Sequence, residues 1–558
     1  MSKNHRLDAV RRGSTNSQSA AIDGVLGGSL DRRSFLRAGS ILGLSLPAMS
    51  LILGACDADS STAAGPVGKI RPGGTLRVGV SAPTGPIDPV TAGNQGSVAM
   101  LLPAGEYLAQ AMPNLSLRPA LAQSWSSNDK GTEWTFKLRR GVTFHDGSAM
   151  TAADVVATID RLADPNGGSI ALSAYKGILS KGATKALDPH TVRFHLDRPV
   201  GNFPYLVSSD TYSSVILPAS YDGNYEKSGF PGTGPMRMKS YNARKGATFV
   251  RNENYWDKAS PASLDQIEFT FYADEQPALL AFQGGDIDVV YQISVQNGRS
   301  VMNNPAYSLI KARSAANRCL HLRTDTGPWQ DKRVRQALAL SVDRTATVKG
   351  LMHGHADLGN DSPFAPVFPT TDRHVPQRSQ NLKMAKRLLA EAGVSRGFKT
   401  SLNAVNQLEV PDLAVLVQDG AKKIGIDLGI KLQDPGAYYG DAKFGSSPWL
   451  DATAGITDYG HRSIPNVYLT AQLASDGVWN SSHIKDPKLD RLIGDFVASV
   501  DPLAQTKAAR DLQTLLLDET PLIYSYFLEF VAVSTNKVTG IVPNATGQLF
   551  LGHAALTA

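Results

Sequence analysis

Regular alternation between strand-like and helix-like segments is the feature that most constrains how this chain can fold. Short stretches in which apolar and polar residues alternate are followed by stretches in which apolar residues recur every three or four positions. This alternation predicts α/β layers, and residues 400–432 predict one βαβ unit. The expected strands are 76–80, 134–138, 192–196, 267–271, 400–405, 426–432 and 522–533, and the expected helices are 332–352, 381–392, 412–423, 487–499 and 502–518.

The N-terminal region resembles a twin-arginine export signal. Residues 1–30 are polar and carry too few large apolar side chains to build a core. Arg32 and Arg33 follow, and after them come an apolar pair and a further basic residue. The weakly apolar stretch 38–55 is shorter than the about 20 strongly apolar residues that a membrane-spanning helix needs. We therefore predict that residues 1–55 form a cleaved signal peptide.

The signal ends in Leu53-Gly54-Ala55-Cys56, which resembles a bacterial lipobox. Cys56 is accordingly the predicted lipidation site and the first residue of the mature chain. The alternative is a plain signal peptide with an incidental cysteine. Residues 56–70 are rich in Ser, Ala and Gly, as expected of a polar tether. These features predict a protein held by a lipid at the outer face of the cytoplasmic membrane or in the periplasmic space.

The composition of the remaining 503 residues limits the possible functions and the number of domains. The first 55 residues hold seven of the 56 Lys and Arg and three of the 50 Asp and Glu, so the rest carries a net charge of +2. That charge leaves no basic surface of the kind that binds nucleic acid. The length predicts two or three domains. With Cys56 lipidated, Cys319 has no partner for an intrachain disulfide, so stability must come from a packed core.

A collinear set of motifs resembles the peptide/nickel-type solute-binding proteins of ABC importers. Its sharpest part is Trp125, then an aromatic strand ending in Leu138-Arg139, then Phe144-His145-Asp146-Gly147 and Thr151-Ala152-Ala153-Asp154-Val155. In the last of these, Thr151 and Asp154 also have the spacing of a capping box that opens a helix. Further matches follow in the family's order: Gly232–Pro235, Arg251–Trp256, Ala281–Asp288 and Pro328–Leu338.

This resemblance implies an α/β fold of the two-lobed periplasmic-binding-protein type (class II) with an inserted extra α/β domain. Lobe I would take residues 71–113, 229–318 and 522–558, the inserted domain 114–228, and lobe III 319–521. The implied function is that of a monomeric, extracytoplasmic binding protein. It would capture a small ligand by hinge closure and deliver it to the permease subunits in the membrane. The family implies no enzyme activity, no cofactor and no metal site.

The predicted ligand contacts lie near residue 458. In peptide-binding relatives, a carboxylate in an Asp-Tyr element pairs with the α-ammonium group of the ligand, and Thr457-Asp458-Tyr459 resembles that element. Asp458 is thus the predicted ammonium partner, with Thr457 and Tyr459 beside it. Trp449 and Trp479 flank this region as candidate ligand contacts, and the alternative for each is core packing.

The ligand class stays open because the family usually continues this element with Asp-Pro, whereas this chain has Gly460 to Pro465. A short peptide is the expected ligand. An oligosaccharide or a nickel or other metal chelate is the alternative, and haem and opine-like ligands are also accepted by relatives.

Two histidine motifs raise an enzyme as the alternative class. His353 and His355 have the spacing of a metal-binding pair but no third ligand nearby in the sequence. His145 and Asp146 could suggest acid–base catalysis, although the family resemblance makes them part of a turn before Gly147. The alternative to a binding protein is therefore a secreted metal-dependent hydrolase.

Overall fold

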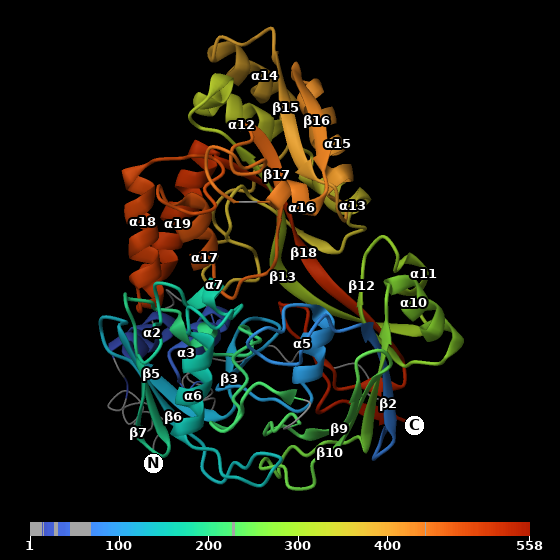
Figure 1. Ribbon diagram of the computed structural model, residues 1–558. Coiled ribbons are helices and arrows are strands. Elements are labelled where there is room, and N and C mark those ends of the chain that lie inside the picture. The colour runs from blue at the N-terminus through green and yellow to red at the C-terminus, as the bar shows by residue number, and fades with distance from the viewer. Residues whose placement is uncertain are drawn as a thin grey trace. The chain divides into compact units, whose positions relative to one another are not determined.

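The fold is described from a computed structural model (Figure 1), which describes residues 14, 16–26, 32–44, 49, 69–225, 229–440 and 442–558. The chain divides into two compact units. Unit 1 comprises Met1–Ala312, Ala498–Leu503 and Phe530–Ala558, and unit 2 comprises Arg313–Val497 and Ala504–Glu529. Strands β13 (Tyr307–Leu322) and β18 (Leu522–Thr535) carry the chain from one unit to the other. The separation of residues 114–228 as a domain of their own stays a prediction.

A mixed sheet forms the centre of unit 1. Its strands follow one another in the order β9 (Met236–Asn242), β10 (Gly246–Arg251), β11 (Gln266–Tyr272), β2 (Thr75–Ser81), β12 (Val289–Ile293) and the end of β18. The strands β11, β2 and β12 run parallel, and α5 (Gln95–Leu101) and α10 (Glu275–Gly284) pack on them. Alternate β2 residues Leu76, Val78 and Val80 are buried, which confirms the predicted strands 76–80 and 267–271.

A second, antiparallel sheet in unit 1 has the order β5 (Ala122–Ser127), β6 (Glu133–Leu138), β8 (Thr191–His195) and β7 (Thr184–Asp188), and α6 (Ala152–Leu162) packs on it (Figure 1). Its core is aromatic, because the rings of Phe136, Phe194 and Phe203 contact one another at centroid distances of 5.0–6.4 Å. Helix α6 begins with the predicted capping box, in which the backbone N–H of Thr151 donates to Asp154 at 2.7 Å.

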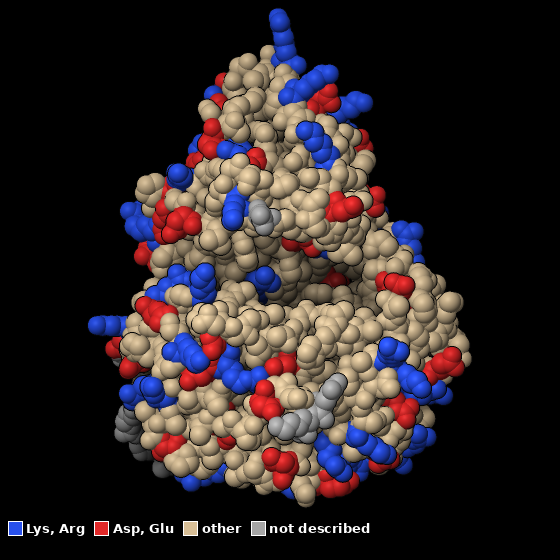
Figure 2. All heavy atoms as spheres, in the orientation of Figure 1, with Lys and Arg blue, Asp and Glu red and all other residues tan. Residues whose placement is uncertain are grey.

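Short elements complete unit 1. They are β1 (Ile70–Arg71), β22 (Ala555–Thr557) and β19 (Val538–Thr539) in one sheet, β3 (Ala109–Ala111) with β4 (Leu117–Pro119), β20 (Val542–Pro543) with β21 (Leu549–Phe550), and helices α7 (Leu172–Tyr175), α8 (Phe203–Leu206) and α11 (Arg299–Met302). Figure 2 shows basic and acidic side chains intermingled on the visible face.

The expectation that residues 1–30 contribute no core is wrong for the part that the structure describes. Helices α2 (Asn16–Leu26) and α3 (Arg32–Ile41) contact each other, and Ile22, Val25 and Phe35 are buried between them. The side chains of Ile22 and Val25, three positions apart, lie on one face of the helix, where Ala21 is buried with them. The indole N–H of Trp125 also donates to the carbonyl of Ile41 at 2.7 Å.

In unit 2 the sheet order is β16 (Ile426–Gln433), β15 (Phe398–Val405), β17 (Ala454–Tyr459), β13 and β18, with β14 (Ala356–Leu358) paired to β18. Strands β15 and β16 are parallel and joined by α15 (Val410–Lys422), which confirms the predicted βαβ unit. Further helices are α14 (Leu382–Glu391), α16 (Pro435–Tyr439), α17 (Asn466–Tyr468), α18 (Pro487–Ala498) and α19 (Pro502–Glu519), with single turns at η1 (Gly327–Gln330) and η2 (Leu469–Leu473).

The single helix predicted over 332–352 is wrong, because the structure has two helices there, α12 (Lys332–Ser341) and α13 (Arg344–Gly350). Val342 adopts an extended backbone conformation (φ −78°, ψ 123°) that interrupts the helix. Asp343 then caps the second helix by accepting a hydrogen bond from the backbone N–H of Ala346. The apolar spacing continued through the break, so it gave no sign of the interruption.

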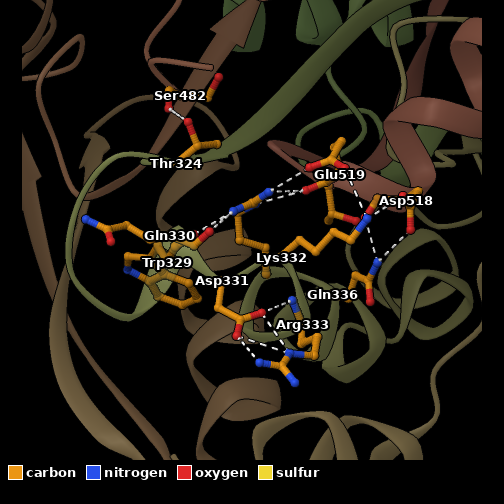
Figure 3. Close-up of polar contacts among 12 residues, drawn as sticks. Thr324, Trp329, Gln330, Asp331, Lys332, Arg333, Gln336, Ser482, Asp518 and Glu519 are labelled. Atoms are coloured by element: carbon orange, nitrogen blue, oxygen red, sulfur yellow. Dashed lines mark hydrogen bonds and ion pairs between the residues drawn. The ribbon is translucent and has the colours of Figure 1, made fainter. Parts of the chain in front are cut away.

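Charged side chains of the motif 328–338 tie α12 to the end of α19 (Figure 3). The ammonium group of Lys332 lies 2.6 Å from Asp518 and 3.1 Å from Glu519. Buried Arg335 donates to the backbone carbonyls of Trp329 at 2.7 Å and Glu519 at 2.6 Å. Lys332 and Arg335 therefore have a structural role in unit 2, where they connect α12 to the end of α19.

Glu106 is a carboxyl group of unit 1 whose surroundings strongly change its pKa. It accepts hydrogen bonds from Trp256 Nε1 at 2.7 Å, Thr233 Oγ1 at 2.8 Å and the Tyr255 hydroxyl at 2.9 Å. These three donors favour the charged form, but burial outweighs them and raises the pKa of Glu106 from 4.5 to about 7.

We expect Glu106→Gln to change how stability depends on pH. Because the folded-state pKa lies above the unfolded value, the contribution of Glu106 is fully present below pH 4.5 and is lost as pH rises through about 7. The free energy of unfolding of the wild type should thus fall by about 3 kcal/mol relative to the variant between pH 5 and 8. Chemical denaturation across this range measures the difference. The exposed control Glu253→Gln should run parallel to the wild type, and a parallel Glu106→Gln profile would show the raised pKa to be wrong.

Candidate ligand-binding site

The predicted Asp-Tyr element forms the end of β17, and its neighbours fix where each side chain points. Strand β17 pairs antiparallel with β13, so that Asp458 lies opposite Arg318 and Tyr459 opposite Asn317. Successive side chains of a strand project to opposite faces. The structure therefore separates the predicted site residues into two groups, one around Asp458 and one around Tyr459.

Tyr439, at the end of α16, holds the Asp458 carboxylate. Its hydroxyl donates to Asp458 Oδ1 and accepts a hydrogen bond from the Asp458 backbone N–H at 3.3 Å. Burial, and next the charge of Asp458, raise the pKa of Tyr439. The ring of Tyr439 meets that of predicted Trp449 edge-on at 6.0 Å. Trp449 is only 4% exposed, so it is a core residue that packs against Tyr439.

Asp458 has no cationic partner in the described part of the chain. The nearest basic residue by strand pairing, Arg318, instead forms an ion pair with Glu409 at 3.0 Å, and both side chains are buried. The hydroxyl of Tyr526 donates to Glu409 at 3.0 Å and completes this pair. Because Arg318 is compensated by Glu409, the Asp458 carboxylate stays available to a cation from outside the protein.

The second group consists of aromatic side chains around Tyr459. Its ring lies 6.3 Å from that of Tyr468 and 6.1 Å from that of predicted Trp479, which is partly exposed. Predicted Thr457 is 2% exposed and lies opposite Cys319. Burial raises the pKa of the Cys319 thiol, so this cysteine is held in its unreactive neutral form.

Arg462 is a candidate that the sequence prediction missed. Its guanidinium carbon lies 6.0 Å from the ring centroid of Trp479, and Nη1 donates to the carbonyl of His461 at 3.0 Å. Its buried Nε has no acceptor, and no carboxylate pairs with it, among the described residues. The one available signal was the segment after Tyr459, where the chain departs from the family's Asp-Pro. His461 in that segment is structural, because Nδ1 accepts from the backbone N–H of Ala315.

The histidine motifs behind the hydrolase alternative lie in turns. His353 and Gly354 both have positive φ, at 47° and 82°. His145 contacts the carbonyl of Gly234 through Nε2 at 2.9 Å, and the backbone N–H of Gly147 closes a turn onto Phe144. Among the described residues, no three His, Cys, Asp or Glu side chains are grouped so that they could hold a metal ion.

The helices in the described part of the chain also differ from membrane-spanning segments. No described helix is long and apolar enough to cross a membrane.

The export and anchoring residues lie at the edge of what the structure describes. Arg32 and Arg33 are the first two residues of α3, and their side chains are outside the described part. Cys56 and most of the predicted tether also lie outside the described residues.

Comparison with known proteins assigns the chain to a family. The profile of the "Bacterial extracellular solute-binding proteins, family 5 Middle" matches residues 116–461. Heme-binding protein A of Haemophilus influenzae is 26% identical over 462 residues, which is 77% of this chain and 82% of that protein. Glutathione-binding protein GsiB of Escherichia coli (strain K12) is 24% identical over 478 residues, 83% of this chain and 91% of that protein.

The fold agrees with this assignment. The unliganded open form of the periplasmic murein tripeptide-binding protein MppA matches with a TM-score of 0.77 at 20% identity, over 88% of this chain and 99% of that one. This match confirms the predicted class II periplasmic-binding-protein fold. The chain belongs to family 5 of the bacterial extracellular solute-binding proteins, and it is the substrate-binding component of an ABC importer.

Proposed function

We propose that the imported ligand is a short peptide whose α-ammonium group pairs with Asp458. The observation that carries this proposal is a carboxylate positioned by the hydroxyl of Tyr439 and left without a cationic partner among the described residues. A hydrogen bond to a charged group contributes about 1.5–3 kcal/mol. The peptide named for MppA and the glutathione named for GsiB support a peptide-like ligand. Closure of two lobes, which the family resemblance implies, stays a prediction.

Arg462 extends the proposal to the other end of the ligand. Its guanidinium rests on Trp479 and has no carboxylate partner in the described part of the chain. Stacking on an indole holds a guanidinium in place while leaving its edge free to donate hydrogen bonds. Arg462 is thus suited to a carboxylate, such as the C-terminus of a peptide. Metal chelates that bear carboxylates would fit Arg462 alone, whereas a neutral oligosaccharide would use neither charge.

The ammonium pairing predicts that Asp458→Asn abolishes selectivity for a free amine. The wild type should bind trialanine about ten to a hundred times more tightly than N-acetyl-trialanine. Asn keeps the shape and the contact with Tyr439 but removes the charge, so the variant should bind both peptides equally weakly. Isothermal titration calorimetry measures the four affinities. The exposed control Asp476→Asn should keep the wild-type preference. Undiminished preference in Asp458→Asn would contradict the proposed pairing.

The role of Arg462 predicts the complementary result for the other terminus. Arg462→Gln should weaken the binding of trialanine about tenfold or more and leave trialanine amide unaffected, because only the carboxylate needs the guanidinium. The exposed Arg491→Gln variant is the matched control for lost charge. If Arg462→Gln weakens both peptides equally, its effect is on packing around Trp479 and the carboxylate assignment is wrong.

We also infer that Cys56 carries a lipid and that Arg32 and Arg33 direct export through the twin-arginine route. Their placement before and after a weakly apolar stretch supports both assignments. In cells, Cys56→Ser should move the protein from the membrane fraction to the soluble extracytoplasmic fraction, because the anchor is lost. Replacing both Arg32 and Arg33 by Lys should leave the protein in the cytoplasm with its signal uncleaved. Retention of Cys56→Ser in the membrane fraction would contradict the lipid anchor.

A further inference from the structure

Unit 1 contains a cavity that none of the predicted site residues line. Its volume is about 480 Å³, within the range of about 300–1,000 Å³ found for small-molecule pockets. The walls come from the segment after α5, from β3 and β4, from the residue after β6, and from segments around residues 256 and 552. All of these segments belong to unit 1, so the cavity is formed without any residue of unit 2.

Glu106 fixes one wall of this cavity. Its carboxylate accepts hydrogen bonds from Trp256 Nε1, Tyr255 and Thr233, and these three donors hold it in place. The hydrogen bond from Nε1 orients the Trp256 indole, which lines the cavity. Glu106 is therefore a positioning residue for Trp256.

Two guanidinium groups also line the cavity. Arg139 donates from Nε to the carbonyl of Ala120 at 2.5 Å, and its central carbon lies 5.1 Å from the ring centroid of Trp256. This arrangement leaves both Nη groups of Arg139 without a protein acceptor among the described residues. Arg118 donates to the side-chain amide oxygen of Gln110. Neither arginine forms an ion pair with a carboxylate in the part of the chain that the structure describes.

The remaining lining combines apolar surface with few other charges. Leu102, Pro119, Pro235 and Phe550 supply apolar walls. Asp257 is the second carboxylate of the lining, and it accepts a hydrogen bond from the backbone N–H of Ala259 at 3.2 Å. The cavity thus offers unpaired guanidinium donors beside an indole face and apolar walls.

We propose that this cavity is a second ligand site, which binds a small organic carboxylate with a flat apolar body. The carboxylate would accept hydrogen bonds from Arg139 and Arg118, because guanidinium groups match carboxylates in geometry and charge. The flat body would lie against Trp256 and the apolar walls. This site is independent of Asp458 and of the imported ligand.

Calorimetric titration of the purified protein with three probes of one shape tests the proposal. Indole-3-acetate should bind, whereas the neutral indole-3-acetamide and the cationic tryptamine should bind at least about tenfold more weakly. Arg139→Gln should weaken indole-3-acetate binding by about tenfold or more. The exposed neighbouring variant Arg140→Gln should leave it unchanged.

Three results would overturn the second site. They are no binding of indole-3-acetate at millimolar concentration, tighter binding of tryptamine, and unchanged binding by Arg139→Gln. Arg118→Gln, which changes an exposed side chain, provides the same test if Arg139→Gln does not fold. Because peptide binding through Asp458 is measured with different probes, the second site and the proposed import function can fail separately.

Discussion

The candidate site depends on the register of β17 against β13. Asp458 lies opposite Arg318, and Tyr459 lies opposite Asn317. A slip of one residue would exchange the two faces and carry the carboxylate into the aromatic group around Tyr459. Strand β13 is itself held by the buried pair of Arg318 with Glu409. Displacing one partner of such a pair leaves a buried charge unmatched, at a cost of about 3–5 kcal/mol.

Some charged side chains of this protein form ion pairs with one another, whereas others have no partner of opposite charge among the described residues. Fully buried Asp361 contacts buried Arg344 at 2.5 Å and partly buried Arg378 at 2.8 Å, so these three charges share one network. Such groups hold segments of unit 2 together. Arg462 and Arg139 differ, because each rests on an indole ring and has no carboxylate partner among the described residues. An arginine that the fold supports but does not neutralise is suited to an anion from outside.

Local structure could be predicted well from the sequence because local patterns determine it. Strands β2, β6, β8 and β11, the capping box of α6 and the β15–α15–β16 unit follow from alternation and from residues three positions apart. The break at Val342 could not be predicted, since the apolar period continues through it. Helix α2 was missed because Ile22 and Val25 are buried by residues outside that helix, among them Phe35 and Leu44.

The candidate site was predictable only in part. Asp458 and Tyr459 could be named from the family resemblance, but their separation onto two faces requires the strand pairing. Tyr439 lies 19 residues before Asp458 on a different element, and no sequence pattern links the two. Arg462 lies in the segment where the chain departs from the family pattern, so its position was visible in the sequence. What makes it a candidate ligand contact is its contact with Trp479, which lies 17 residues further along the chain.

The two faces of β17 also restrict the length of a ligand that uses both charges. Asp458 projects to one face, whereas Arg462 lies over Trp479 in the aromatic group of the other face. Between them the exposed Gly460 has no side chain, and a Cβ there would approach only Arg462 Nη1, at 3.6 Å. A ligand that reaches both charges must therefore pass the end of the strand. An extended peptide spans about 3.5 Å per residue, so several residues suit this path better than a single amino acid, whose two charged groups are bonded to the same Cα.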